Sequence, residues 1–166
     1  MEDQIVEKLF NFSILREDII YLVNSVHEDS GLDKEALLYE LQILKIISIG
    51  LSSNFLLKNK NDREKISEKY WLKILEFSKV LSETSKNFSG VDIDYFDILK
   101  KKFDVYLEEI NENLDAKEPA AVIGPCFASE CGNRYNAFAV LSGAKIFKSC
   151  FSGVRKILSQ SDYLTY

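Results

Sequence analysis

Turn-forming residues are scarce in this chain, which has only two prolines and seven glycines among its 166 residues. An all-β fold of this length needs many more turns, so the shortage favours helices. Hydrophobic residues make up 46% of the chain and charged residues 28%, as in an average globular protein, which argues against wholesale disorder. The length suits one domain, and we expect residues 1–166 to form a single all-α domain.

Residues and motifs that perform chemistry are also few. The chain has one histidine, His27, and none of the sequence signatures of nucleotide-binding loops, α/β-hydrolases or zinc proteases. A di-iron bundle needs Glu-x-x-His pairs on two helices, which one histidine cannot supply. A calcium loop starting at Asp92 would need glycine where Asp97 stands and glutamate where Phe103 stands. The sequence therefore gives no reason to expect a metal ion or another cofactor.

The three cysteines do not suit a secreted disulfide framework, because an odd number leaves one thiol free. Cys126 and Cys131 have the wrong spacing for a zinc knuckle or a thioredoxin-type pair, and Cys150 falls on an apolar helix face. Cys126 follows a Gly-Pro pair where a helix can begin, and the positive end of a helix lowers a thiol pKa. Cys126 is therefore our candidate reactive thiol, although Glu130 opposes that shift, and only its reactivity would support an enzymatic role.

The charge balance and the apolar runs bear on partners and location. A net charge of −5 argues against general nucleic-acid binding, which requires a surplus of Lys and Arg. The acidic N-terminus lacks the basic region of a signal peptide. The most apolar run, Ile43–Leu51, has nine residues and contains Lys45, whereas a membrane span needs about twenty. We expect a soluble, cytoplasmic protein without a transmembrane segment.

Apolar residues recur every three or four positions almost throughout, which predicts amphipathic helices. Four long antiparallel helices are predicted, over residues 5–28, 33–55, about 63–87 and about 92–114, with a local bend near residues 11–13 as an alternative within the first. Asp33 is expected to cap the second helix, and residues 87–90 to close the third. The apolar positions of the third helix, Phe77 and Leu81 among them, are expected to face the core. The second helix is apolar on most faces, so we expect it at the centre of the bundle. The polar run 58–62 is predicted to be a loop, with Asn61 capping the third helix.

The C-terminal part is predicted to add a helical extension, giving five or six helices in all. Pro119 and Pro125 each stand where a helix can begin, and Gly132-Asn133 separates a short helix from a final one over residues 134–159. Small and apolar residues fill 119–132 without a clear helical phase, so this segment is a candidate lid or protein contact. Ala139 and Gly143, on the apolar side of the final helix, would permit close approach of a neighbouring helix.

A row of basic side chains lies opposite that apolar side, and we call it the basic stripe. Its members are Arg134, Lys145, Lys148, Arg155 and Lys156. The stripe can bind an acidic partner, a phosphate-bearing ligand or an anionic membrane surface. It can equally be an ordinary solvated face, or match the acidic face of the fourth helix within the same molecule. That acidic face contains Asp104, Glu108, Glu112 and Asp115, with Glu109 and Glu118 nearby.

Two functions follow as hypotheses. The first is a protein-interaction module that presents exposed helix faces, with the basic stripe and segment 119–132 as contact surfaces, to an unknown partner or to a second copy of itself. The second is a helical bundle that binds a small apolar or anionic ligand between aromatic-lined helices. The identity of the partner or ligand cannot be read from periodicity.

Overall fold

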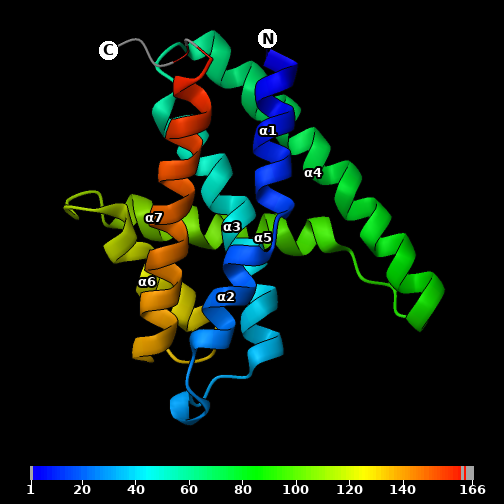
Figure 1. Ribbon diagram of the computed structural model, residues 1–166, viewed down its shortest axis with the longest axis vertical. Coiled ribbons are helices and arrows are strands. Elements are labelled where there is room, and N and C mark those ends of the chain that lie inside the picture. Colours follow the sequence, from blue (N-terminus) through cyan, green and yellow to red (C-terminus); the bar gives the residue numbers. More distant parts are fainter. Residues whose placement is uncertain (1, 162, 164–166) are drawn as a thin grey trace.

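The computed structural model describes residues 2–161 and 163, and in them the chain forms seven α-helices, one short 3-10 helix and no strand (Figure 1). The elements are α1 (Glu2–Ile14), α2 (Glu17–Ser25), η1 (Glu28–Ser30), α3 (Lys34–Leu56), α4 (Lys60–Ser89), α5 (Tyr95–Glu112), α6 (Pro119–Glu130) and α7 (Ala137–Ser159). The predicted all-α fold is confirmed.

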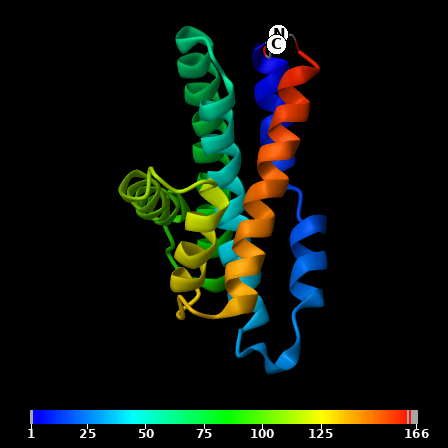
Figure 2. The same ribbon diagram turned by 90° about the vertical axis from the view of Figure 1, so that its left-hand side faces the viewer.

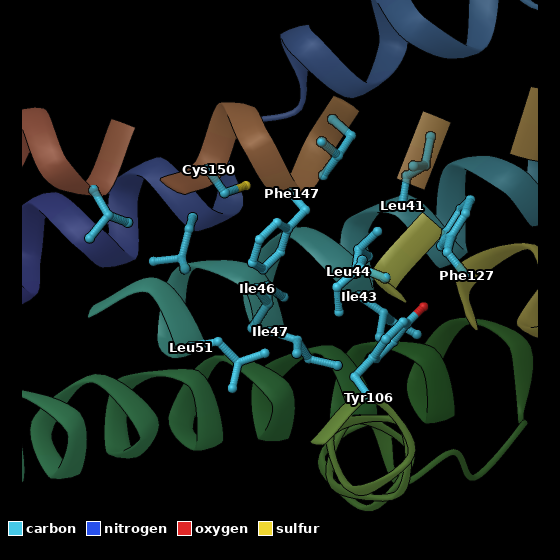
Figure 3. Packing of buried hydrophobic residues seen from close by; sticks show 14 of the residues in the cluster. Leu41, Ile43, Leu44, Ile46, Ile47, Leu51, Tyr106, Phe127, Phe147 and Cys150 are labelled. Atoms are coloured by element: carbon cyan, nitrogen blue, oxygen red, sulfur yellow. The ribbon is translucent and has the colours of Figure 1, made fainter. Parts of the chain in front are cut away.

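Helix α3 is the central helix, as its apolar sequence predicts. Asp33 caps its first turn by accepting a hydrogen bond from the Ala36 N–H at 2.7 Å. From Ile43 to Ser53 every residue is buried, because the other long helices surround this part of α3. Figure 3 shows its leucine and isoleucine side chains meeting Tyr106 of α5, Phe127 of α6, and Phe147 and Cys150 of α7.

The first predicted helix is two helices, because the chain leaves the helical path after Ile14. A buried lysine of α3, Lys45, holds this break: its Nζ donates to the Leu15 carbonyl at 2.8 Å. The same Nζ lies 2.8 and 2.9 Å from the carboxylate oxygens of Asp18, in the first turn of α2. Gln42 donates to the Ser13 carbonyl at 2.8 Å. Two side chains of α3 therefore satisfy carbonyls that the end of α1 leaves without helical partners.

Helix α4 begins earlier than predicted, and its cap is Asn59 rather than Asn61. The Asn59 side chain accepts hydrogen bonds from the Asn61 and Asp62 N–H groups. Its end agrees with the sequence, since Gly90 adopts the left-handed conformation (φ 71°) that closes many helices. Helix α4 runs parallel to α1, with Glu2 near Lys65 and Phe10 near Phe77, as the first and third helices of an antiparallel bundle do. Helix α5 crosses the bundle rather than aligning with it (Figures 1 and 2).

Helices α6 and α7 form a tightly packed hairpin along α3 (Figure 2). Pro119 starts α6 as predicted, but Pro125 lies inside this helix, so the second predicted start is wrong. A Cβ at Gly143 would lie 2.6 Å from the Phe127 Cβ, and one at Gly124 would lie 2.8 Å from the Val140 carbonyl oxygen. Glycine at both positions lets the two helices approach closely, as predicted for Gly143.

Helices α3 and α7 are each long and apolar enough to cross a membrane, judged by length and composition alone. In α3, 72% of the apolar window is buried inside the bundle, which is typical of a core helix; in α7 the share is 39%. The expectation that the chain has no transmembrane segment stays a prediction.

Candidate functional site

An apolar groove with a volume of about 360 Å³ lies between α3, α4 and α5. We call it the α3–α4 groove. Its lining residues are Ile14, Arg16, Glu35, Leu38, Tyr39, Gln42, Ile43, Ile46, Phe77, Ser78, Leu81, Tyr95 and Leu99. Most of this lining is aliphatic or aromatic, with one cation and one carboxylate. Burial raises the pKa of Tyr39, which keeps its phenol neutral. The groove thus offers an apolar surface with a few polar groups.

One wall of the groove belongs to a row of mostly apolar side chains on α4, which we call the α4 stripe. Its members are Ile66, Tyr70, Ile74, Phe77, Leu81, Thr84 and Phe88. At 100° per residue these positions fall within an arc of about 80°, so they share one face of the helix. Ile66, Tyr70 and Ile74 are buried, Phe77 is half-buried, Leu81 is 39% exposed and Phe88 is 89% exposed. The stripe therefore leaves the core and continues into solvent.

The α4 stripe becomes exposed because its cover ends. Helices α1 and α4 run side by side with the Phe10 and Phe77 rings 5.8 Å apart, so the end of α1 at Ile14 falls near Leu81. Beyond Ile14 the chain turns onto α3, where Lys45 and Asp18 fix the new direction. Figure 1 shows the C-terminal part of α4 extending past the other helices. The break between α1 and α2 thus creates both the groove and the uncovered end of the stripe.

The basic stripe does not form one free surface. Arg134 lies in the turn before α7 and pairs with Glu109 of α5 at 2.8 Å. Lys148 pairs with Glu118 at 2.8 Å. These two cations therefore pair within the molecule, with the two glutamates that lie near the predicted acidic face and not with its four members.

The remaining three cations of the basic stripe, Lys145, Arg155 and Lys156, are exposed on α7. Arg155 lies over the Phe151 ring, 5.3 Å from its centroid. Neither Lys145 nor Lys156 forms an ion pair with another residue in the part of the chain that the structure describes. The part of the basic stripe that is free to contact a partner is therefore a short row of these three solvent-exposed cations.

Segment 119–132 is not an irregular lid. Residues 119–130 are helix α6, and six of them are buried, mainly against α7: Ala120, Ile123, Gly124, Cys126, Phe127 and Ala128. Its missing helical phase has a physical reason, because a helix packed on several sides is apolar on several sides. Most of the surface predicted to contact a partner is used inside the fold.

Cys126 lies in the middle of α6 rather than in a first helical turn, so the reason for expecting a reactive thiol is wrong. Its side chain is 2% exposed. Burial, and then the charges of Glu109 and Glu130, raise the pKa of the Cys126 thiol to about 12. Burial likewise raises the pKa of Cys131 and of Cys150 to about 12. An activated nucleophile requires a lowered pKa, so these environments act in the opposite direction.

These pKa values predict slow alkylation of the native thiols. With the Cys126 pKa raised from 9.0 to about 12, its thiolate fraction at pH 7.5 falls roughly a thousandfold, and only the thiolate reacts. We expect iodoacetamide to label Cys126 in the folded protein at least a hundredfold more slowly than in urea, as measured by peptide mass spectrometry. A cysteine placed at exposed Ser159 serves as the control and should react at the same rate in both conditions. Faster labelling of native Cys126 than of this control would restore the catalytic hypothesis.

The most organised polar cluster joins α3, α5 and α6. Lys102 Nζ lies 2.8 Å from both Glu40 carboxylate oxygens and 2.7 Å from Glu130 Oε2. Burial alone lowers the pKa of Lys102, but hydrogen bonds to Glu130 and Glu40 outweigh it, and the net pKa is raised. The buried Tyr106 hydroxyl also has a raised pKa, mainly through desolvation. The cluster ties three helices together without providing an activated nucleophile. Among the described residues, no three His, Cys, Asp or Glu side chains are placed to hold a metal ion.

Sequence reasoning assigned Phe77 and Leu81 to the core and did not identify the groove. The available signal was Phe88, which continues the same helical face past Leu81 to within two residues of Gly90. The sequence permits a bend near residues 11–13, but it does not show that α1 leaves this face of α4 uncovered. No protein-family model, curated protein or solved structure matches the chain, so its function must be argued from the groove, the stripe and the surrounding charges.

Proposed function

We propose that the protein is an interaction module whose α3–α4 groove and α4 stripe receive an apolar helix from another protein chain. The observation that carries this proposal is the passage of one apolar helix face from core to solvent directly beside the groove. Leu81 and Phe88 are members of that face, and Val80 beside them is also exposed. Exposed apolar groups that adjoin a groove are typical of interaction sites, because burying them removes apolar surface from water.

A helix is the ligand shape that this site favours. The groove is bounded by the helices α3, α4 and α5, and an amphipathic helix presents anchors at i, i+3, i+4 and i+7 to such a surface. Addition of an extended strand needs a sheet edge, and residues 2–161 and 163 contain no strand. The exposed cations Lys145, Arg155 and Lys156 form a separate polar surface on α7, which we propose as a weaker contact for acidic partners.

A library of amphipathic helical peptides displayed on phage tests this proposal with a defined probe. We expect selected peptides to bind the full chain with micromolar or better affinity. Leu81→Glu should weaken binding at least tenfold, because it places a carboxylate in the apolar wall. Leu141→Glu is the matched control, since Leu141 is an exposed leucine on α7. Equal binding to wild type and to Leu81→Glu would exclude the groove as the interaction site.

A second function, binding of a small apolar molecule, is favoured by the size of the groove. A volume of about 360 Å³ lies at the lower end of small-molecule pockets, which are mostly apolar with a few polar groups. Tyr39, Gln42, Ser78 and Tyr95 supply uncharged polar groups, and Arg16 and Glu35 supply the charged ones. Native mass spectrometry of purified protein distinguishes this function: a bound molecule retained by wild type and lost in Leu81→Trp, which fills the groove, would support it. Wild type and Leu81→Trp both free of any molecule would argue against it.

We also propose a cytoplasmic location. All three cysteines are free thiols, and Cys126 and Cys150 are buried in the core. Unpaired thiols in a chain of this size suit a reducing compartment.

A further inference from the structure

We infer that the helix that occupies the groove is α4 of a second copy, in an antiparallel, two-fold symmetric pair. This inference rests on the proposed interaction function and names its partner. The α4 stripe is self-complementary: Phe77 and Phe88 lie symmetrically about the midpoint between Ser82 and Glu83, as do Leu81 and Thr84. An antiparallel pair centred at that midpoint places Phe88 of each copy against Phe77 of the other. A two-fold interface of this kind needs only one surface patch.

The pairing gives the highly exposed Phe88 ring an apolar site. Phe88 is 89% exposed in the single chain, and moving a phenylalanine ring from water into an apolar site is favourable. The groove that Phe88 of the second copy would enter has Phe77 and Leu81 on one wall and Tyr39 and Tyr95 facing them. A buried aromatic anchor in an apolar pocket is the usual centre of a protein interface.

Charge placement on α4 permits this contact. The residues that flank the stripe between Phe77 and Phe88 are Ser78, Val80, Ser85 and Asn87, none of which is charged. The charged residues of this part of the helix, Glu76, Lys79, Glu83 and Lys86, lie about 80° or more outside the arc of the stripe. Association therefore buries apolar groups without removing a charge of α4 from water, which would oppose binding. Lys86 keeps its 3.1 Å ion pair with Asp92.

Sedimentation velocity of the full chain between 1 and 200 µM tests the inference. We expect wild type to form a dimer of twice 19.0 kDa with increasing concentration. Phe88→Asp should stay monomeric across this range, while Phe138→Asp, which changes an exposed phenylalanine of α7, should dimerise like wild type. Both residues are at the surface, so circular dichroism should show unchanged helix content and a similar melting temperature. A monomeric wild type at 200 µM, or a dimer that survives Phe88→Asp, would overturn the inference.

The register can be measured separately. A cysteine at Thr84 lies near the proposed two-fold axis, so a short bis-maleimide should link two copies of Thr84→Cys, whereas Ser159→Cys should not crosslink.

Groove-binding peptides distinguish self-pairing from the more general interaction function. If wild type is monomeric while selected peptides still require Leu81, the interaction function stands and self-pairing is wrong. If wild type dimerises through Phe88, the same peptides should dissociate the dimer, since both use one groove.

Discussion

Replacing Asp18 by Ala is expected to destabilise the protein by about 3–5 kcal/mol, because it leaves the Lys45 ammonium buried without its counter-ion. The Lys45 side chain is 1% exposed and lies 2.8 Å from an Asp18 carboxylate oxygen. Its remaining partners are the Leu15 carbonyl and the face of the Phe12 ring, 4.8 Å from Nζ. Domains of this kind are stable by only about 5–15 kcal/mol, so the loss is a large fraction. Urea unfolding followed by circular dichroism measures it, and the melting temperature should fall by roughly 10 °C.

Two variants test whether the buried charge is the cause. Glu17→Ala removes an acidic residue from the same first turn of α2, but Glu17 is exposed, so stability should change by less than about 0.5 kcal/mol. In Asp18→Asn combined with Lys45→Met, no charge remains in the core, and we expect part of the lost stability to return. A double variant less stable than Asp18→Ala would show that the ammonium contributes through the Leu15 carbonyl and not through the ion pair.

Gly143→Ala is expected to destabilise the protein by about 1–3 kcal/mol, although alanine favours helices by about 1 kcal/mol over glycine. The added methyl would lie 2.6 Å from the Phe127 Cβ, an atom attached directly to the backbone of α6. Removing this steric clash requires α6 and α7 to move apart, which disturbs the core packing along both helices. Thermal unfolding followed by circular dichroism should show a lower melting temperature.

Gly153→Ala provides the matched control on α7. Its Cβ would meet Phe12 Cε1 at 2.5 Å, but this atom lies at the far end of a half-buried ring that can turn aside. We expect a change in stability smaller than that of Gly143→Ala, and a gain if the ring moves freely. Equal destabilisation by the two substitutions would mean that the close approach of α6 and α7 has no special energetic role.

The sequence predicts the structure correctly where a single helix face or a single capping residue determines it. Asp33 as a cap, Gly90 as a helix end and the burial of Leu37, Leu41 and Leu44 on α3 follow from residues within a few positions of one another. The predictions from the sequence were wrong where contacts between distant parts of the chain determine the structure. Pro125 was assigned to a helix start because proline is favoured at the first helical position, yet it lies inside α6.

The candidate site was missed for the same reason. Sequence periodicity marks Phe77, Leu81 and Phe88 as one apolar face, but it does not say what covers that face. Four members of the basic stripe lie on α7, whereas Arg134 lies in the turn before it. Arg134 and Lys148 find their partners on segments that only the fold brings near.

The amino-acid sequence by itself determined that this chain is helical, which helix is central, and which glycine of α7 permits close packing, because these depend on helical period and side-chain size. Only the tertiary structure decided where the first helix ends. Lys45, about 30 residues away from Leu15, provides the hydrogen bond and charge that redirect the chain. Since that redirection uncovers the end of α4, the groove and the exposed stripe are consequences of a long-range contact that no local pattern encodes.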